Sequence, residues 1–428
     1  MRVMIVGSGG REHALACTVA RSDAVETVFV APGNPGTAAE AKVTNVDLPP
    51  DDFEALASFA ERRAADLTIV GPEAPLVAGI RDHFDACGLK CFGPSRAAAR
   101  LEGSKSFAKR FMARHGIPTA ACEVFTDAAA AERYIRGRGA PIVVKADGLA
   151  AGKGVVVARD VEEAVEAVGH MLSADRFGEA GHQVVIEDFL VGEEASFICI
   201  CDGEQAVPFA SSQDHKPRDE GDTGPNTGGM GAYSPAPVVT PAVHDRIMGE
   251  IVNPLIRGAL ADGMPYQGFL YAGLMITPDG SPSVVEFNCR FGDPEAQPVL
   301  ARLRSDLAEL CLRAVDGRGL EGATLEWDTR AALGVVLAAG GYPLDYDKGD
   351  AIAGLDDDLP DTKVFHAGTA VSDGTVVTAG GRVLCVVGLG EDIAAAQSLA
   401  YQRVATIHWR RMTYRRDIGF RALQRAIG

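Results

Sequence analysis

The side chains best suited to chemistry lie near residue 290, in the run V-V-E-F-N-C-R-F-G-D-P-E-A-Q. Glu286 and Asn288 are two residues apart on a predicted strand, so their side chains face the same side. A carboxylate and an amide oxygen on one face suit a Mg²⁺ ion that bridges nucleotide phosphates. Arg290 follows the same alternation if the strand continues, and Val285 and Phe287 are expected to bury the opposite face. The alternative is a solvated strand end whose arginine has ordinary hydrogen-bond partners.

Two lysines flank a glycine-rich loop in the run K-A-D-G-L-A-A-G-K-G-V. Lys145 ends one predicted strand, and Lys153 lies just before the next. A Walker A loop needs four residues between its glycines and a Ser or Thr after its lysine. Here only three residues separate Gly148 from Gly152, and another glycine follows the lysine. The segment therefore predicts a hairpin flap whose lysines neutralise nucleotide phosphates, or else a plain surface hairpin.

A third glycine loop, G-S-G-G-R-E-H, joins a short apolar run to a helical pattern near the N-terminus. A dinucleotide-binding fingerprint needs a third glycine where Glu12 stands, and Asp23 and Glu26 come too early to bind a ribose. These differences argue against a nicotinamide cofactor. The backbone N–H groups at the helix start could still bind a phosphate, with added charge from Arg11. A tight turn without a ligand is the alternative.

Two further segments are suggestive but weak alone. In V-V-I-E-D-F-L-V-G-E-E-A, backbone groups after Glu187 could bind an adenine edge, and Glu194 could bind ribose hydroxyls. The run S-S-Q-D-H-K leads into D-T-G-P-N-T-G-G-M-G-A-Y, whose glycines favour either a disordered loop or a backbone that closely approaches a ligand. Composition does not choose between these two alternatives.

The elements that must position these groups begin with a parallel α/β unit. Strand and helix patterns alternate over the first hundred residues, which predicts a parallel sheet with ligands at the carboxyl ends of its strands. Polar loops follow those ends at 7–13, 31–37 and 71–76. The predicted strands are 3–6, 27–30 and 67–70, and the predicted helices are 11–21 and 53–63.

The remaining chain predicts an α/β and α+β multidomain architecture with a core, an inserted lid and a smaller mixed domain. We expect domains at 1–103, 104–327 and 328–428, with the lid at about 123–192. Ser104 is expected to cap a helix that runs to about Arg114. The other expected elements are strands 142–145, 154–158, 183–187, 268–276, 283–287, 331–338, 364–366 and 382–387, helices 161–172 and 392–407, and a long Gly/Pro loop at 221–237.

Composition limits the function classes. The 428 residues are 47% hydrophobic and carry a formal net charge of −17, which argues against disorder and against a broad nucleic-acid-binding surface. Nine cysteines form no C-x-x-C pair, so we expect small buried thiols in a reducing compartment. No apolar stretch approaches 18 residues, so we expect a soluble cytoplasmic protein without a membrane or nucleic-acid partner. We also expect a monomer.

The motifs together, in their order along the whole chain, resemble the phosphoribosylamine–glycine ligase family of ATP-grasp enzymes. The resemblance rests on GSGGREHAL, APGNPGT, TIVGPEAPL, LEGSK, KADGLAAGKGV, SQDHK, DTGPNTGGMGAYSPAP, EFNCRFGDPE, AAGGYP and VFHAGT. It implies that glycine is joined to 5-phosphoribosylamine, with ATP cleaved to ADP and phosphate, through a glycyl phosphate, in purine biosynthesis. The alternatives are another ATP-grasp carboxylate–amine ligase of nucleotide metabolism and a catalytically silent nucleotide-binding protein.

The resemblance also implies roles for particular residues. Glu286 and Asn288 would bind Mg²⁺ or Mn²⁺, and Lys153 and Arg290 would serve catalysis, with Arg290 on the transferring phosphoryl group or acyl phosphate. Asp293 would bind the ammonium of glycine. The residues implied for ATP are Lys105, Lys145, Lys153, Glu187, Leu190 and Glu194. Those implied for the phosphoribosyl substrate are Gly9, Gly10, Arg11, Glu12, Asn34, Glu73, Asp214 and Lys216.

The chain departs from the wider superfamily at one point. Many members carry an acid on the strand before the metal-binding strand, whereas Y-A-G-L-M-I at 271–276 has none. The number of bound metal ions and their geometry therefore stay open.

Replacing the flap lysine tests its expected role. Lys153→Ala should lower turnover by on the order of a hundredfold, because the transferring phosphoryl group loses a cation. The free energy of unfolding should change by less than about 0.5 kcal/mol, since an exposed flap contributes little to the core. Steady-state kinetics and denaturation of the same preparation measure both quantities. A large loss of stability would contradict the assignment.

Overall fold

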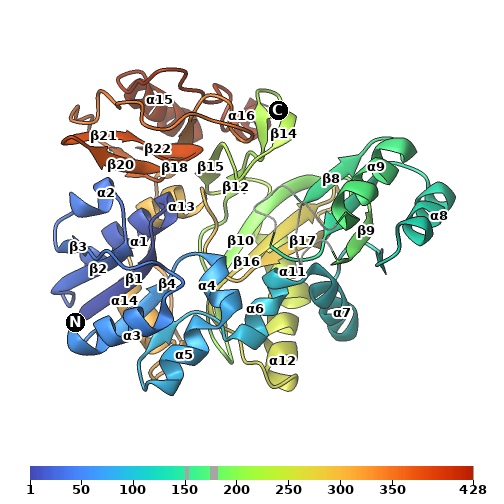
Figure 1. The fold of residues 1–428 in the computed structure, drawn as a ribbon, viewed down its shortest axis with the longest axis horizontal. Helices are drawn as coiled ribbons and strands as arrows, with labels where there is room; N and C mark the ends of the chain where they lie inside the picture. The colour runs from blue at the N-terminus through green and yellow to red at the C-terminus, as the bar shows by residue number, and fades with distance from the viewer. Residues whose placement is uncertain (150–153, 174–181, 428) are drawn as a thin grey trace.

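The computed structural model describes residues 1–149, 154–173 and 182–427 (Figure 1). Within these residues the strands form four sheets of four or five strands and two small hairpins. The expected α/β and α+β multidomain architecture is confirmed. Among the helices described, none combines the length and apolar character needed to cross a membrane.

The N-terminal unit is a five-stranded parallel sheet with the order β3-β2-β1-β4-β5, drawn in blue in Figure 1. Residues 3–6 are fully buried, as expected for a central strand covered on both faces. The predicted strands and helices of this unit are confirmed. Its elements are β1 (Arg2–Gly7), α1 (Gly10–Ala20), β2 (Thr27–Pro32), α2 (Pro35–Ala38), β3 (Val43–Asn45), α3 (Phe53–Arg62), β4 (Leu67–Val70), α4 (Glu73–Ala78), α5 (Ile80–Ala86), β5 (Cys91–Phe92) and α6 (Arg96–Gly103).

A second, antiparallel sheet with the order β6-β9-β7-β8 forms the green unit at the right of Figure 1. Ser104 caps α7 (Lys105–His115), which leads into this unit, by accepting the N–H of Phe107, as predicted. Lys145 on β7 pairs with Val155 on β8, so the predicted hairpin is confirmed. Lys153 lies outside the described residues. The elements are β6 (Cys122–Phe125), α8 (Ala128–Arg138), β7 (Ile142–Ala146), β8 (Val155–Ala158), α9 (Val161–Leu172) and β9 (Val184–Asp188).

The central sheet has the order β11-β10-β16-β17 and antiparallel pairing throughout. Aromatic rings join it to the N-terminal sheet. The Phe269 ring lies 4.8 Å from Phe92 of β5 and 5.0 Å from Phe291, between ring centroids. The elements are β10 (Glu193–Asp202), β11 (Ala206–Pro208), α11 (Pro241–Ile247), η2 (Met248–Val252), α12 (Asn253–Ala261), β16 (Gln267–Ile276), β17 (Pro282–Asn288), α13 (Ala296–Arg302) and α14 (Leu307–Arg313).

The fourth sheet, β12-β15-β18-β22-β19, combines C-terminal strands with two strands from the middle of the chain. The expectation of one long loop at 221–237 is therefore wrong in part, because β14 (Thr223–Asn226) and β15 (Gly231–Ser234) lie inside it. β15 pairs with β18, which supplies its backbone hydrogen-bond partners. The glycine-rich sequence alone does not indicate this pairing. The other elements are β12 (Gln213–Asp214), β13 (Pro217–Asp219), β18 (Ala331–Ala338), β19 (Thr362–His366), β20 (Thr369–Ser372), β21 (Thr375–Thr378), β22 (Arg382–Gly390), α15 (Ile393–Val404) and α16 (Phe420–Ile427).

The aromatic contact between the first and third sheets predicts a measurable loss of stability. Phe269→Ala should lower the free energy of unfolding by about 3–5 kcal/mol, because a buried ring leaves a cavity. Phe189 is 40% exposed, and Phe189→Ala should cost less than about 1 kcal/mol. Urea denaturation of both variants measures the difference. Equal losses would contradict the proposed role of the aromatic contact.

Candidate active site

The N-terminal sheet and the central sheet meet at the start of helix α1. A Cβ atom on Gly10 would lie only 2.5 Å from Nε2 of Gln297, which sits at the start of α13. Any larger residue at position 10 would therefore require the Gln297 side chain to move. This close approach brings the glycine loop after β1 beside the turn that follows β17.

Glu286 and Asn288 lie on β17 with Phe287 between them, so their side chains share one face as predicted. Burial works to raise the pKa of Glu286, but the positive charges of Lys216 and two other lysines outweigh it and hold that pKa low. A charged carboxylate and an amide oxygen are the donors that a hard divalent cation prefers. The pair therefore fits a Mg²⁺ or Mn²⁺ ion.

The expected alternation along β17 holds only in part. The pairing with β16 skips Val285, because Gly273 pairs with Glu286 whereas Leu274 pairs with Val284. This bulge leaves Val285 half-buried, so the expectation that it lies in the core is wrong, while Phe287 is buried. The carbonyl of Val285 instead accepts a hydrogen bond from Lys145 Nζ at 3.0 Å.

Arg290 lies beyond the end of β17, so its position does not come from strand alternation. Two carboxylates hold its guanidinium, Glu73 at 3.2 Å and Glu102 at 3.1 Å. Its Nη2 also donates to Asn288 Oδ1 at 3.0 Å. Glu102 accepts the backbone N–H of Cys289 at 2.7 Å as well, so one buried acid fixes both the end of the strand and the arginine.

The lysines expected to contact a nucleotide converge on the same region. Lys145 forms an ion pair with Glu187 at 3.0 Å, and Lys109 pairs with the same carboxylate oxygen at 3.1 Å. Lys105 donates to the carbonyl of Gly148 at 2.8 Å, and burial lowers its pKa. The hairpin base is thereby tied to α7.

The acidic segment between β9 and β10 connects the lid to the central sheet. Leu190 is half-buried in this connection, and Glu194 follows it at the start of β10. Glu194 pairs with Lys216 at 2.9 Å, and Lys216 Nζ lies 3.9 Å from Glu286. Asp214 lies nearby on β12, where burial raises its pKa to about 7. Lys216 therefore bridges the expected ribose-binding and metal-binding acids.

The N-terminal loop offers less free positive charge than the sequence suggests. The N–H of Gly9 donates to Glu12 at 2.6 Å, and Arg11 forms an ion pair with the same carboxyl group at 2.6 Å. Arg11 also lies 3.9 Å from Glu73. Asn34 donates hydrogen bonds to the carbonyl of Ser8 at 2.8 Å and to that of His366 on β19 at 2.9 Å. These groups hold the loops in place.

Asp293 is also paired inside the protein. Gln297 Nε2 donates to one of its carboxylate oxygens at 2.9 Å, and Arg382 donates to the other at 3.0 Å. Arg382 additionally donates to the carbonyl of Asp293 and to that of Gly228. The C-terminal sheet thus reaches the candidate active site through one arginine of β22.

Sequence reasoning missed several residues that position the site. Lys109 follows Lys105 by one turn of the same helix, so local spacing could have indicated it. Glu102 lies in the motif LEGSK, but its partner Arg290 is distant in the chain, so local spacing gave no signal for it. Asp147 accepts hydrogen bonds from Ser106 and from neighbouring polar groups at the hairpin base. Arg382 had no such signal, since it is 89 positions from Asp293 in the chain.

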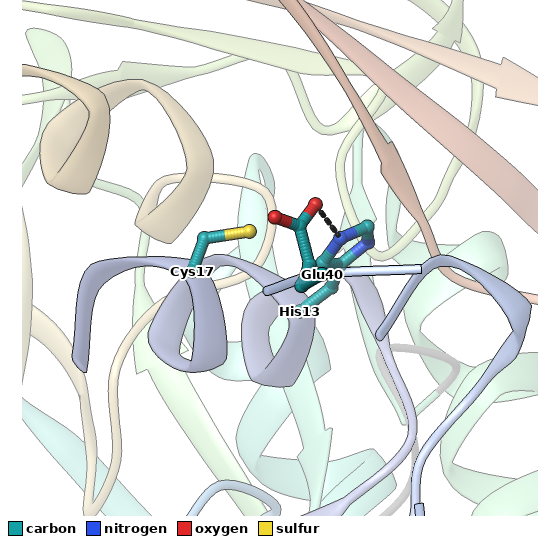
Figure 2. Close-up of side chains that lie close together, drawn as sticks. All are labelled: His13, Cys17 and Glu40. Atoms are coloured by element: carbon teal, nitrogen blue, oxygen red, sulfur yellow. Dashed lines mark hydrogen bonds and ion pairs between the residues drawn. The ribbon is translucent and has the colours of Figure 1, made fainter. Parts of the chain in front are cut away.

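A second cluster could in principle hold a metal ion, namely His13, Cys17 and Glu40 (Figure 2). His13 Nδ1 accepts the backbone N–H of His366 at 2.8 Å, so Nε2 carries the proton and donates to Glu40 at 3.1 Å. A metal ligand needs the opposite arrangement, with its second nitrogen donating. Lys363 also pairs with Glu40. The cluster is therefore a polar contact between α1 and β19.

Comparison with protein families covers nearly all of the chain. Residues 1–102 match the N domain of phosphoribosylglycinamide synthetase, residues 103–296 match its ATP-grasp (A) domain, and residues 332–421 match its C domain. The phosphoribosylamine–glycine ligase of Allochromatium vinosum is 61% identical over 427 residues, or 99% of each chain. That of Escherichia coli O157:H7 is 59% identical over 427 residues, again 99% of each chain.

Solved structures agree with this result. The phosphoribosylamine–glycine ligase of Thermotoga maritima has a TM-score of 0.85 and 36% identity, and the match covers 98% of this chain and 100% of that one. Biotin carboxylase of Campylobacter jejuni shares the fold alone, with a TM-score of 0.74, 15% identity and coverage of 96% and 92%. From its three matched domains and its full-length relatives, the chain belongs to the phosphoribosylglycinamide synthetase family.

Proposed function

We propose that the chain joins glycine to 5-phosphoribosylamine at the expense of ATP and yields glycinamide ribonucleotide, ADP and phosphate in de novo purine biosynthesis. The full-length relatives named phosphoribosylamine–glycine ligase support this activity. The single observation that carries the proposal is the Glu286–Asn288 oxygen pair beside Arg290, in a chain that matches all three family domains.

The chemistry explains why no serine or cysteine nucleophile is needed. A carboxylate is a poor acyl donor, because an attacking amine would have to expel an oxide ion as the leaving group. When the glycine carboxylate attacks the γ-phosphate, it becomes glycyl phosphate, and the amine of the second substrate then displaces phosphate. The barrier is mostly charge crowding, which cations and positioning reduce.

Glu286 and Asn288 would hold Mg²⁺ or Mn²⁺ through their oxygens. Such an ion, when bound, neutralises charge on the nucleotide phosphates. Arg290 would contact the transferring phosphoryl group, because Glu73 and Glu102 hold its guanidinium beside the metal-binding pair. Its fork of N–H donors matches a phosphoryl group better than a lysine would.

We assign the phosphates of ATP to Lys105 and Lys145, with Lys153 on the flap. The Glu187 carboxylate is occupied by lysines, so backbone groups after it would bind the adenine edge. Leu190 would pack against the base, and Glu194 would bind the ribose hydroxyls. These assignments place the nucleotide between the lid and the central sheet.

The remaining substrates belong on the side of domain 1–103. Asp293 would bind the ammonium of glycine, and the phosphoribosyl substrate would lie against the loop groups, which are Gly9, Gly10, Arg11, Glu12, Asn34, Glu73, Asp214 and Lys216. The ion pairs inside the protein leave these groups with little net positive charge, so they suit the amine and ribose hydroxyls of the substrate better than its phosphate.

The proposed organisation has three domains, at 1–103, 104–327 with a lid at about 123–192, and 328–428. We propose that the protein is a monomer in the cytoplasm. Nine free cysteines support the cytoplasm, because they suit a reducing compartment.

An assay that omits each substrate in turn tests the activity. ADP formation, coupled to NADH oxidation, should require ATP, glycine and freshly generated phosphoribosylamine together. Glu286→Gln should lower the rate by on the order of a hundredfold, because the metal-binding pair loses its charge. Activity with another carboxylic acid but not with glycine would favour a different ligase. ATP binding without turnover would favour the catalytically silent alternative.

A further inference from the structure

The two groups assigned to a divalent cation already contact cations of this chain. Arg290 Nη2 lies 3.0 Å from Asn288 Oδ1, and Lys216 Nζ lies 3.9 Å from Glu286 Oε1. A divalent ion on these oxygens would sit close to both positive groups, and like charges at such distances repel strongly where the side chains are largely buried. A divalent ion and the two basic side chains therefore compete for the oxygens of Asn288 and Glu286.

Each basic side chain has other partners that keep it in the site. Arg290 remains paired with Glu73 and Glu102 if it leaves Asn288. Lys216 remains paired with Glu194 at 2.9 Å. Each basic side chain therefore keeps a carboxylate partner after it leaves the metal ligands. This matters because a buried charge without a partner is strongly destabilising. The N–H groups so released would be free for an incoming phosphoryl group.

We propose that Arg290 and Lys216 are internal competitors of the divalent cation, occupying its ligands in the metal-free protein and giving them up when the ion binds. Glu73, Glu102 and Glu194 are the positioning residues that retain the two side chains. This inference rests on the metal site of the proposed function. The protein thereby lowers its own metal affinity and keeps two cations beside the reacting phosphoryl group.

The competition predicts opposite effects on activity and on metal binding. Arg290→Met and Lys216→Met should each lower ligase activity, yet each should bind Mn²⁺ about threefold or more tightly than the unchanged protein, because a repelling charge is gone. Mn²⁺ titrations followed by the electron paramagnetic resonance signal of the free ion measure affinity without turnover. The titrations are run on the full chain with MnCl₂ alone and with ADP present, which lacks the transferring phosphoryl group.

Control variants show whether the gain in Mn²⁺ affinity comes from loss of a positive charge at this site. Arg290→Lys keeps the charge and should leave Mn²⁺ affinity near that of the unchanged protein. Arg246→Met removes an arginine that pairs with Glu250 on the surface, and it should have no effect. Adding Glu286→Gln to Arg290→Met should abolish the gain, since the tighter site must be the one that contains Glu286.

The result that overturns the proposal is unchanged or weaker Mn²⁺ binding in either methionine variant that remains folded. A gain that survives in the Glu286→Gln double variant also overturns it, because the ion would then bind elsewhere. A purely structural role for Arg290 and Lys216 predicts the loss of both activity and affinity. If the ligase assay fails but the predicted gains in Mn²⁺ affinity are observed, the proposed substrates are rejected. The proposed competition between the basic side chains and the metal ion is then still supported.

Discussion

Burying an ammonium or guanidinium group is costly unless a carboxylate lies beside it, and this constraint shapes the candidate active site. Arg11 lies against Glu12, Lys145 against Glu187, Lys216 against Glu194, and Arg290 between two acids. The formal net charge of −17 therefore does not conflict with a site for anionic substrates. The cations are present, but a carboxylate of the protein compensates each one.

The same pairing joins the domains to one another. Arg290 follows the central sheet, whereas its partners Glu73 and Glu102 belong to α4 and α6 of the N-terminal unit. Arg382 of the C-terminal sheet reaches Asp293 in a similar way. Because these ion pairs cross unit boundaries, the site is complete only when all the units are assembled. A multidomain ligase that must exclude water from a reactive acyl phosphate benefits from such an arrangement.

Much of the fold follows from local pattern. Short β-branched runs ended by Gly or Pro predict the N-terminal strands correctly, and the cap at Ser104 fixes the start of α7. Strand alternation alone places Glu286 beside Asn288. The bulge at Val285 and the pairing of β15 with β18 could not be predicted, because both depend on backbone partners distant in sequence. Likewise, spacing identifies basic residues but says nothing of the acids that neutralise them from other domains.

Phosphorylation of the glycine carboxylate itself is the step on which the proposed reaction depends. The direct test is to incubate glycine labelled with ¹⁸O in its carboxylate with the enzyme, ATP and phosphoribosylamine. Mass spectrometry of the released phosphate then shows whether it carries the label. Attack by the carboxylate on the γ-phosphate, followed by displacement by the amine, transfers one labelled oxygen to each phosphate. Phosphate without the label would contradict the account, because the carboxylate oxygen would then never have been bonded to phosphorus.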